Sequence, residues 1–173
     1  KYCLMDGGIK VPMVMSWPGM FESGKRIDAI VTHRDLYPSL SEITRVPPKK
    51  DLDGKSLLPL IDGEIDVIHS DPIFWDSGNM MVNWVVRDGD WKMVFRGKGR
   101  DYQAYQLDEI GLVKDEFRIV PIQSGMQLYN LAEDPGESRN LASANPERVQ
   151  AMEKLYLDWR ATMGEPISGK QAK

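Results

Sequence analysis

The sequence is poor in the residues that build disulfides and metal sites: among 173 residues it has one cysteine, Cys3, and two histidines, His33 and His69. A single cysteine excludes an internal disulfide and a cysteine-built metal site, and histidines this far apart match no zinc-binding spacing. There is no basic run and the net charge is −4, which favours neither nucleic acid nor an anionic membrane as a partner. The longest apolar runs, such as residues 11–17, are far too short to span a bilayer.

The sequence also has no initial methionine and no leader segment before its first apolar stretch. It begins at Lys1 and soon enters residues 11–17, which have the composition of a buried strand ended by Pro18 and Gly19. We therefore expect part of the function, and the neighbours of this strand, to lie upstream of Lys1. An apolar strand without neighbours invites pairing with other chains. The isolated chain is accordingly expected to self-associate or to be partly disordered before about residue 50.

Two helices follow from local signals. Thr32 and Asp35 are spaced as a capping box, and apolar residues then repeat at helical spacing, which predicts a helix over residues 34–44. Near the end of the chain, Asn145 and Pro146 have the types preferred at a helix start, and an apolar face continues to Met163.

Strands are predicted between these helices. An Asp-Gly pair separates two β-rich runs, residues 82–87 and 91–96, which predicts a hairpin with a tight turn. Residues 73–75 and 127–131 are further strands, and residues 97–125 are expected to be an elaborated loop with one or two short strands. Trp75, Trp84 and Trp91 would suit either a sugar-stacking platform or the core of the sheet, and the area that each indole buries favours the core.

Six short blocks, in this order, resemble the C-terminal part of the sulfatase family. They are residues 6–12 (Asp-Gly-Gly-Ile-Lys-Val-Pro), 17–19 (Trp-Pro-Gly), 35–40 (Asp-Leu-Tyr-Pro-Ser-Leu), 52–60 (Leu-Asp-Gly-Lys-Ser-Leu-Leu-Pro-Leu), 87–92 (Arg-Asp-Gly-Asp-Trp-Lys) and 127–142, which contains Asp-Pro-Gly-Glu. Each block alone is a weak signal, but their common order and spacing are specific. Lys10 stands where the family usually has arginine.

The resemblance implies that the parent protein is a sulfuric ester hydrolase. Family enzymes use a formylglycine made from the cysteine or serine of a Cys/Ser-x-Pro-x-Arg motif, together with a calcium (or magnesium) ion. The motif is absent here, so the nucleophile and the metal ligands are expected upstream, and this fragment alone is expected to be inactive. Lys1 stands six positions before Gly7. In the family a lysine at this spacing contacts the sulfate and the leaving oxygen, so Lys1 is the catalytic candidate on this chain.

The resemblance also predicts an α/β fold in two parts, α+β within this chain. Residues 1–64 would end a large, mostly parallel sheet domain, and residues 65–173 would form a small four-stranded antiparallel sheet packed on the C-terminal helix. Loops 76–83 and 97–122 would then help to select the substrate. The expected partners are a sulfated small molecule or sulfated glycan and the upstream half of the same protein, and a periplasmic or secreted location is favoured.

Two other functions stay open at this point. The parent could be a phosphoester or phosphonate hydrolase of the same superfamily, which the upstream nucleophile motif would decide. The chain could instead be a binding or structural module without chemistry, in which Lys1 is a solvated terminal lysine. For His33 a surface position is expected, and a substrate contact by His69 has no support from the sequence.

Overall fold

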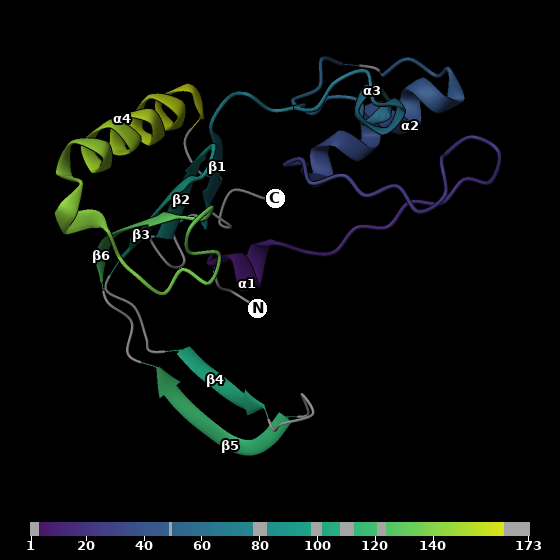
Figure 1. Ribbon diagram of the computed structural model, residues 1–173. Helices are drawn as coiled ribbons and strands as arrows, with labels where there is room; N and C mark the ends of the chain where they lie inside the picture. The colour runs from purple at the N-terminus through teal and green to yellow at the C-terminus, as the bar shows by residue number, and fades with distance from the viewer. Residues whose placement is uncertain are drawn as a thin grey trace, which may run out of the picture. The chain divides into compact units, whose positions relative to one another are not determined.

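The computed structural model describes residues 4–48, 50–77, 83–97, 102–107, 113–120 and 124–164, with residues 102–107 and 113–120 described by their backbone alone (Figure 1). The chain divides into two compact units. We call Lys1–Val11 together with Pro72–Lys173 the sheet unit, and Pro12–Asp71 the helical unit. The predicted assignment of residues 1–64 and 65–173 to two domains of a longer protein stays a prediction.

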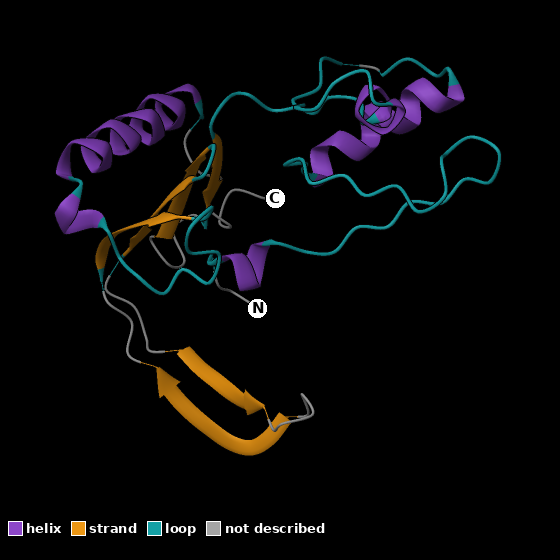
Figure 2. Cartoon of the chain, viewed as in Figure 1, coloured by secondary structure: helices purple, strands orange, loops and turns teal. Residues whose placement is uncertain are grey.

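The sheet unit contains the predicted four-stranded antiparallel sheet, which is confirmed (Figure 2). Its strands lie in the order β1-β2-β3-β6. Their bounds are Ile73–Asp76 for β1, Asn83–Asp88 for β2, Trp91–Arg96 for β3 and Gly125–Asn130 for β6. Tyr102–Leu107 (β4) and Val113–Val120 (β5) form a separate antiparallel pair within the long predicted loop.

The predicted hairpin between β2 and β3 is also confirmed. Asp88 pairs with Trp91, which leaves Gly89 and Asp90 as a two-residue turn. Gly89 has a φ of 56°, a conformation that glycine adopts without steric cost, and glycine at the first turn position suits a type II′ hairpin. The sequence therefore fixes the register of the two central strands locally.

One face of the sheet is covered by helix α4 (Pro146–Thr162), and the core lies between them. Trp84 lies in this core, where its ring stacks on Tyr156 of α4 with centroids 3.9 Å apart. Trp91 packs against the edge of the same cluster. The core interpretation of Trp84 is therefore confirmed, and a sugar platform that uses it is excluded.

The opposite face of the sheet has a smaller core. It is formed by residues that alternate with those facing α4, namely Val85, Val94, Tyr129 and Leu131, with Leu4, Met5 and Trp75 packed against them. Leu4 and Met5 directly precede helix α1 (Asp6–Ile9), so the N-terminal segment packs on this face. Alternation of apolar residues to both faces is what a covered antiparallel strand requires.

Helix α4 begins as predicted at Pro146, but Asn145 does not cap it through its side chain. Its side-chain amide instead donates to the carbonyl of Leu141, 3.0 Å away. Leu141 directly precedes the short helix η3 (Ala142–Ala144), so this hydrogen bond spans that helix. The Asn145 side chain therefore forms a hydrogen bond within the preceding turn and does not cap α4.

In the helical unit, η1 (His33–Asp35) leads into α2 (Leu36–Thr44), which confirms the predicted helix. A shorter helix, α3 (Leu58–Asp62), follows. Leu57, Leu60 and Ile68 form a small core with Ala29 and Val31 packed against it. None of the helices among the described residues is long and apolar enough to cross a bilayer.

The strand predicted over residues 11–17 is not formed. These residues have no regular secondary structure, and Val11 and Val14 are 75% and 92% exposed. A strand needs a neighbour to accept and donate its backbone hydrogen bonds, and within the described ranges no segment pairs with residues 11–17. Apolar composition alone was therefore not sufficient to make a strand here.

Candidate functional site

The predicted catalytic residue, Lys1, lies outside the described residues. So do residues 78–82 of one predicted substrate loop, and residues 98–101, 108–112 and 121–122 of the other. We therefore describe the side chains that lie next to these segments in the sequence or contact the residues that do. The first group lies at the N-terminal end of α1, shortly after Lys1 in the sequence.

A buried charged cluster of three residues, Lys92, Asp6 and Glu137, holds α1. The ammonium of Lys92 lies 2.7 Å from Asp6 Oδ1 and 2.7 Å from Glu137 Oε1. Its side chain has no exposed surface, and those of Asp6 and Glu137 are 14% and 3% exposed. The second carboxylate oxygen of Glu137 accepts the backbone N–H of Asp6 at 2.6 Å. Charges this deep are tolerated because each has a charged or hydrogen-bonded partner.

Each member of the charged cluster comes from a different family block. Asp6 belongs to residues 6–12, Lys92 to residues 87–92 and Glu137 to the Asp-Pro-Gly-Glu turn. That turn presents Glu137 with a φ of 53°, in the left-handed region that costs a non-glycine residue strain. Three blocks that are far apart in sequence therefore meet at one point.

The turn before Glu137 is fixed by Asp134. Its carboxylate accepts the backbone N–H of Arg139 at 2.8 Å and the hydroxyl of Ser138 at 2.9 Å. These bonds, the one from Arg139 first, lower the pKa of Asp134. Asp134 thus stabilises the turn that the composition of this segment predicted. This turn presents Glu137 to Lys92.

The helical unit is organised by a second buried charge, Asp35. Its carboxylate accepts the backbone N–H of Thr32 at 2.6 Å, as the capping box predicts, and that of Lys55 at 3.0 Å. Its Oδ2 also lies 2.9 Å from Nε2 of His69, a side chain only 8% exposed. His69 is thus a partner of Asp35, and His33 is exposed as expected.

The pKa of Asp35 shows which of two opposed effects prevails. Burial by itself raises the pKa of this carboxyl, because it disfavours the charged form. Hydrogen bonds from His69, Lys55 and Thr32 act in the other direction and outweigh burial, so the pKa lies below its usual value. Asp35 is therefore a stably ionised acceptor rather than a general acid.

The same network brings two family blocks, residues 35–40 and 52–60, into contact. Ser39 accepts the backbone N–H of Leu57 at 2.8 Å. A Cβ built on Gly54 would lie 2.1 Å from the carbonyl oxygen of Arg34, so only glycine allows this close approach. We call Asp35, Ser39, Gly54, Lys55 and His69 the Asp35 network.

A third polar cluster lies at the base of loop 76–83. The hydroxyl of Tyr156 donates to Asp76 Oδ2 at 2.8 Å, and Arg160 lies 3.5 Å from the same oxygen. Ser77 and Asn83 then close the loop, because Ser77 donates its backbone N–H to the carbonyl of Asn83 at 3.0 Å. Helix α4 thereby holds Asp76, at the described start of this loop.

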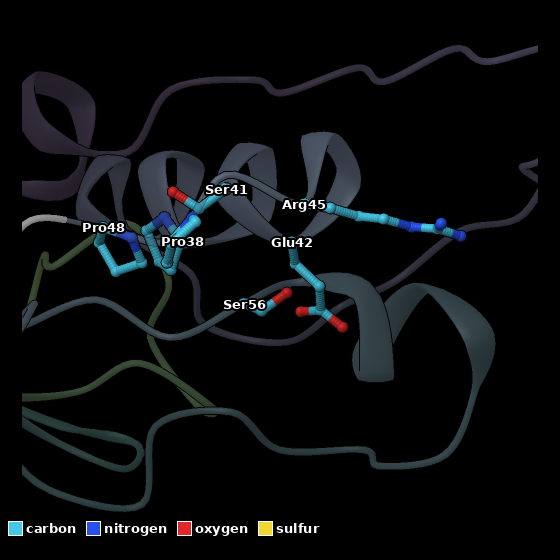
Figure 3. Close-up of a pocket in the computed structure, with 7 residues that line it drawn as sticks. Pro38, Ser41, Glu42, Arg45, Pro48 and Ser56 are labelled. Carbon is cyan, nitrogen blue, oxygen red and sulfur yellow. The ribbon is translucent and has the colours of Figure 1, made fainter.

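The helical unit also has a surface pocket of about 410 Å³. Pro38, Pro47 and Pro48 form much of its lining, and Glu42 and Arg45 are its charged residues (Figure 3). The lining contains no histidine, cysteine or lysine that could act as a base or a nucleophile. Within the ranges that the structure describes, no three side chains of His, Cys, Asp or Glu gather into a possible metal site.

Comparison with known proteins identifies the family of the chain. Residues 1–161 match the family described as N-sulphoglucosamine sulphohydrolase, C-terminal. The chain belongs to this family. The predicted resemblance to the C-terminal part of sulfatases is thereby confirmed.

Individual proteins similar to this chain are also named sulfatases. The ulvan-active sulfatase of Formosa agariphila is 28% identical over 187 residues, 97% of this chain and 36% of the relative. Arylsulfatase A of Homo sapiens is 31% identical over 164 residues, 88% of this chain and 31% of the relative. The chain therefore spans about a third of the length of these curated relatives.

A solved structure shows the same fold. The crystal structure of Ps i-CgsB superposes with a TM-score of 0.57 at 18% identity, over 83% of this chain and 27% of that one. At this identity the likeness concerns the fold alone. It agrees with the small sheet and terminal helix described above.

Proposed function

We propose that this chain is the C-terminal part of a sulfatase, an enzyme that hydrolyses a sulfate ester to an alcohol and inorganic sulfate. The observation that carries the proposal is the family match over residues 1–161. The named relatives, an ulvan-active sulfatase and arylsulfatases, point to the same class of reaction. They also support a sulfated small molecule or a sulfated glycan as the substrate.

In this proposal the nucleophile, a formylglycine, and the ligands of a calcium or magnesium ion lie upstream of Lys1. The metal ion would supply positive charge to the sulfate oxygens. The described residues bring no set of metal ligands together, so we assign the ion no ligand on this chain. This chain would supply the scaffold, the loops beside the substrate and the ammonium of Lys1.

Lys1 would act as a point charge. Negative charge develops on the leaving oxygen as the sulfate ester breaks, and an ammonium placed beside it stabilises the transition state. Removing one such electrostatic contact in an enzyme lowers kcat by roughly 10²–10³-fold. We expect a loss of that size for Lys1→Ala in the longer protein.

The test compares two proteins, this chain alone and the same chain with its upstream coding sequence. Turnover of an aryl sulfate is expected only from the longer protein, and Lys1→Ala should remove most of it. Lys154→Ala is the matched control, because Lys154 is 75% exposed and pairs only with Asp158 on the same helix among the ion pairs that the structure describes. Turnover by the short chain, or a longer protein that hydrolyses phosphate esters in preference, would contradict the proposal.

A further inference from the structure

We infer that the charged cluster of Lys92, Asp6 and Glu137 is a positioning device: it holds α1 on the small sheet and thereby fixes the path of the chain that leads to Lys1. The consequence for catalysis rests on the proposed sulfatase function. The attachment of α1 does not, and it can be tested separately.

The geometry gives α1 two linked attachments. Lys92 on β3 binds the side chain of Asp6 at 2.7 Å, and Glu137 binds both Lys92 at 2.7 Å and the backbone N–H of Asp6 at 2.6 Å. The three groups therefore close a ring in which the side chain and the backbone of Asp6 are both fixed. A ring of this kind sets the position of the helix end as well as its affinity for the sheet.

Helix α1 has little stability of its own. It has four residues, none of them completely buried, whereas isolated helices shorter than about 12 residues are marginal in water. Its other attachment is apolar contact by Leu4 and Met5 with the face of the sheet. Apolar contacts are non-directional, so the direction in which the chain leaves the sheet depends on the charged cluster.

Lys1 is joined to the sheet unit through α1. In the sequence it stands five positions before Asp6, and an extended chain spans at most about 3.6 Å per residue, so this connection is at most about 18 Å long. Catalytic groups lose roughly a hundredfold in rate when they are misplaced by about 1 Å. A loose α1 would therefore impair Lys1 through the chain that joins the two.

The first experiment measures hydrogen exchange of individual amides in the longer protein, because the isolated chain is expected to be partly disordered before about residue 50. The variant is Lys92→Met, which leaves two carboxylates facing each other without a cation. The amides of Asp6, Gly8 and Lys10, which donate to Glu137, Met5 and Asp6, are the reporters. We expect them to exchange at least about a hundredfold faster while the amides of β2 and β3 stay protected.

Two further variants keep the test decisive. Lys154→Met makes the same substitution at an exposed ion pair and should leave the reporters unchanged. Glu137→Gln is milder and covers the case in which Lys92→Met unfolds the sheet, since it should accelerate the same reporters by about tenfold. Unchanged reporters in both cluster variants, or loss of protection in the whole sheet in both, would overturn the inference.

The second experiment uses the longer protein and an aryl sulfate. Lys92→Met should lower kcat by roughly tenfold to a hundredfold and change KM by less than about twofold, because it displaces a group needed in the transition state. Wild-type kcat in this variant would overturn the positioning role and leave the proposed function intact. A wild-type protein without sulfatase activity would overturn the proposed function and leave the exchange result standing.

Discussion

Asp35 in the helical unit and Lys92 in the sheet unit are both completely buried charged side chains, but they are stabilised differently. Asp35 is surrounded by donors, two of them backbone N–H groups, and its described partners lie within 34 residues of it. Lys92 is held by two carboxylates, and the cluster bonds span 86 and 131 residues of sequence. One network folds a segment onto itself, and the other ties distant segments together.

This difference has energetic consequences. The donors around Asp35 stabilise one charge with several hydrogen bonds, so losing one donor removes one bond and leaves the others in place. The charged cluster holds two negative groups and one positive group. Removing the positive one leaves like charges buried together without a cation, which is strongly destabilising. The comparison predicts how each unit responds to matched substitutions.

The largest effect that we expect in the helical unit comes from Gly54→Ala. The new Cβ would collide with the carbonyl of Arg34 at 2.1 Å, so block 52–60 must move off Asp35, at a cost of about 3 kcal/mol. The amides of Lys55 and Leu57 should then exchange roughly a hundredfold faster. Gly7→Ala in α1 is the control, because its Cβ would meet no atom within 4 Å. Equal effects at both glycines would show that the close approach at Gly54 does not matter.

The same substitution at two aspartates separates the networks further. Asp35→Asn places an amide N–H₂ among donors, leaves at least one donor unpaired and should cost about 2 kcal/mol. Asp6→Asn leaves an oxygen for Lys92 and reduces the cluster from a net charge of −1 to zero, so it should cost less than about 1 kcal/mol. Segment-resolved hydrogen exchange measures both. A larger loss at Asp6 would reverse the comparison.

The Asp35 substitution also has a defined pH dependence. The folded-state pKa is lowered, so the unfolded chain binds the proton at higher pH than the folded chain does. The carboxylate therefore contributes fully above its unfolded pKa of about 3.9, and the contribution is lost as the pH falls below that value through the folded pKa. The difference in unfolding free energy between wild type and Asp35→Asn should shrink below about pH 4. A constant difference would show that the charge of Asp35 is not what matters.

Sequence reasoning succeeded where the partners are local. The capping box joins Thr32 and Asp35, three residues apart, and the Asp-Gly pair at residues 88 and 89 marks the turn between β2 and β3, so both could be predicted. The strand over residues 11–17 could not, since its formation depends on a neighbour that composition does not reveal. The sheet as a whole was predictable because its turns and its alternating strands agree.

The charged cluster was missed for a related reason. No local pattern links Asp6, Lys92 and Glu137, and periodicity carries no information about which strand face a distant carboxylate approaches. One signal was present: Lys92 falls on the same face of β3 as Val94, within an otherwise apolar run. A lysine at a buried position of a strand predicts an acidic partner, although the sequence does not name it.

The effect of a single neutral hydrogen bond can be measured at the third polar cluster, which is intermediate in burial. Burial first, and then the hydrogen bond to Asp76, raise the pKa of Tyr156 to about 12. Tyr156→Phe keeps the stacking on Trp84 and removes one hydrogen bond, at about 1 kcal/mol. Since the folded pKa is raised, the contribution of the hydroxyl is complete below the unfolded value of about 10 and is lost as the pH rises toward 12. Urea unfolding at neutral and alkaline pH should therefore show the two proteins converging, and a difference that persists would mean that the phenol hydroxyl does not hold the base of loop 76–83.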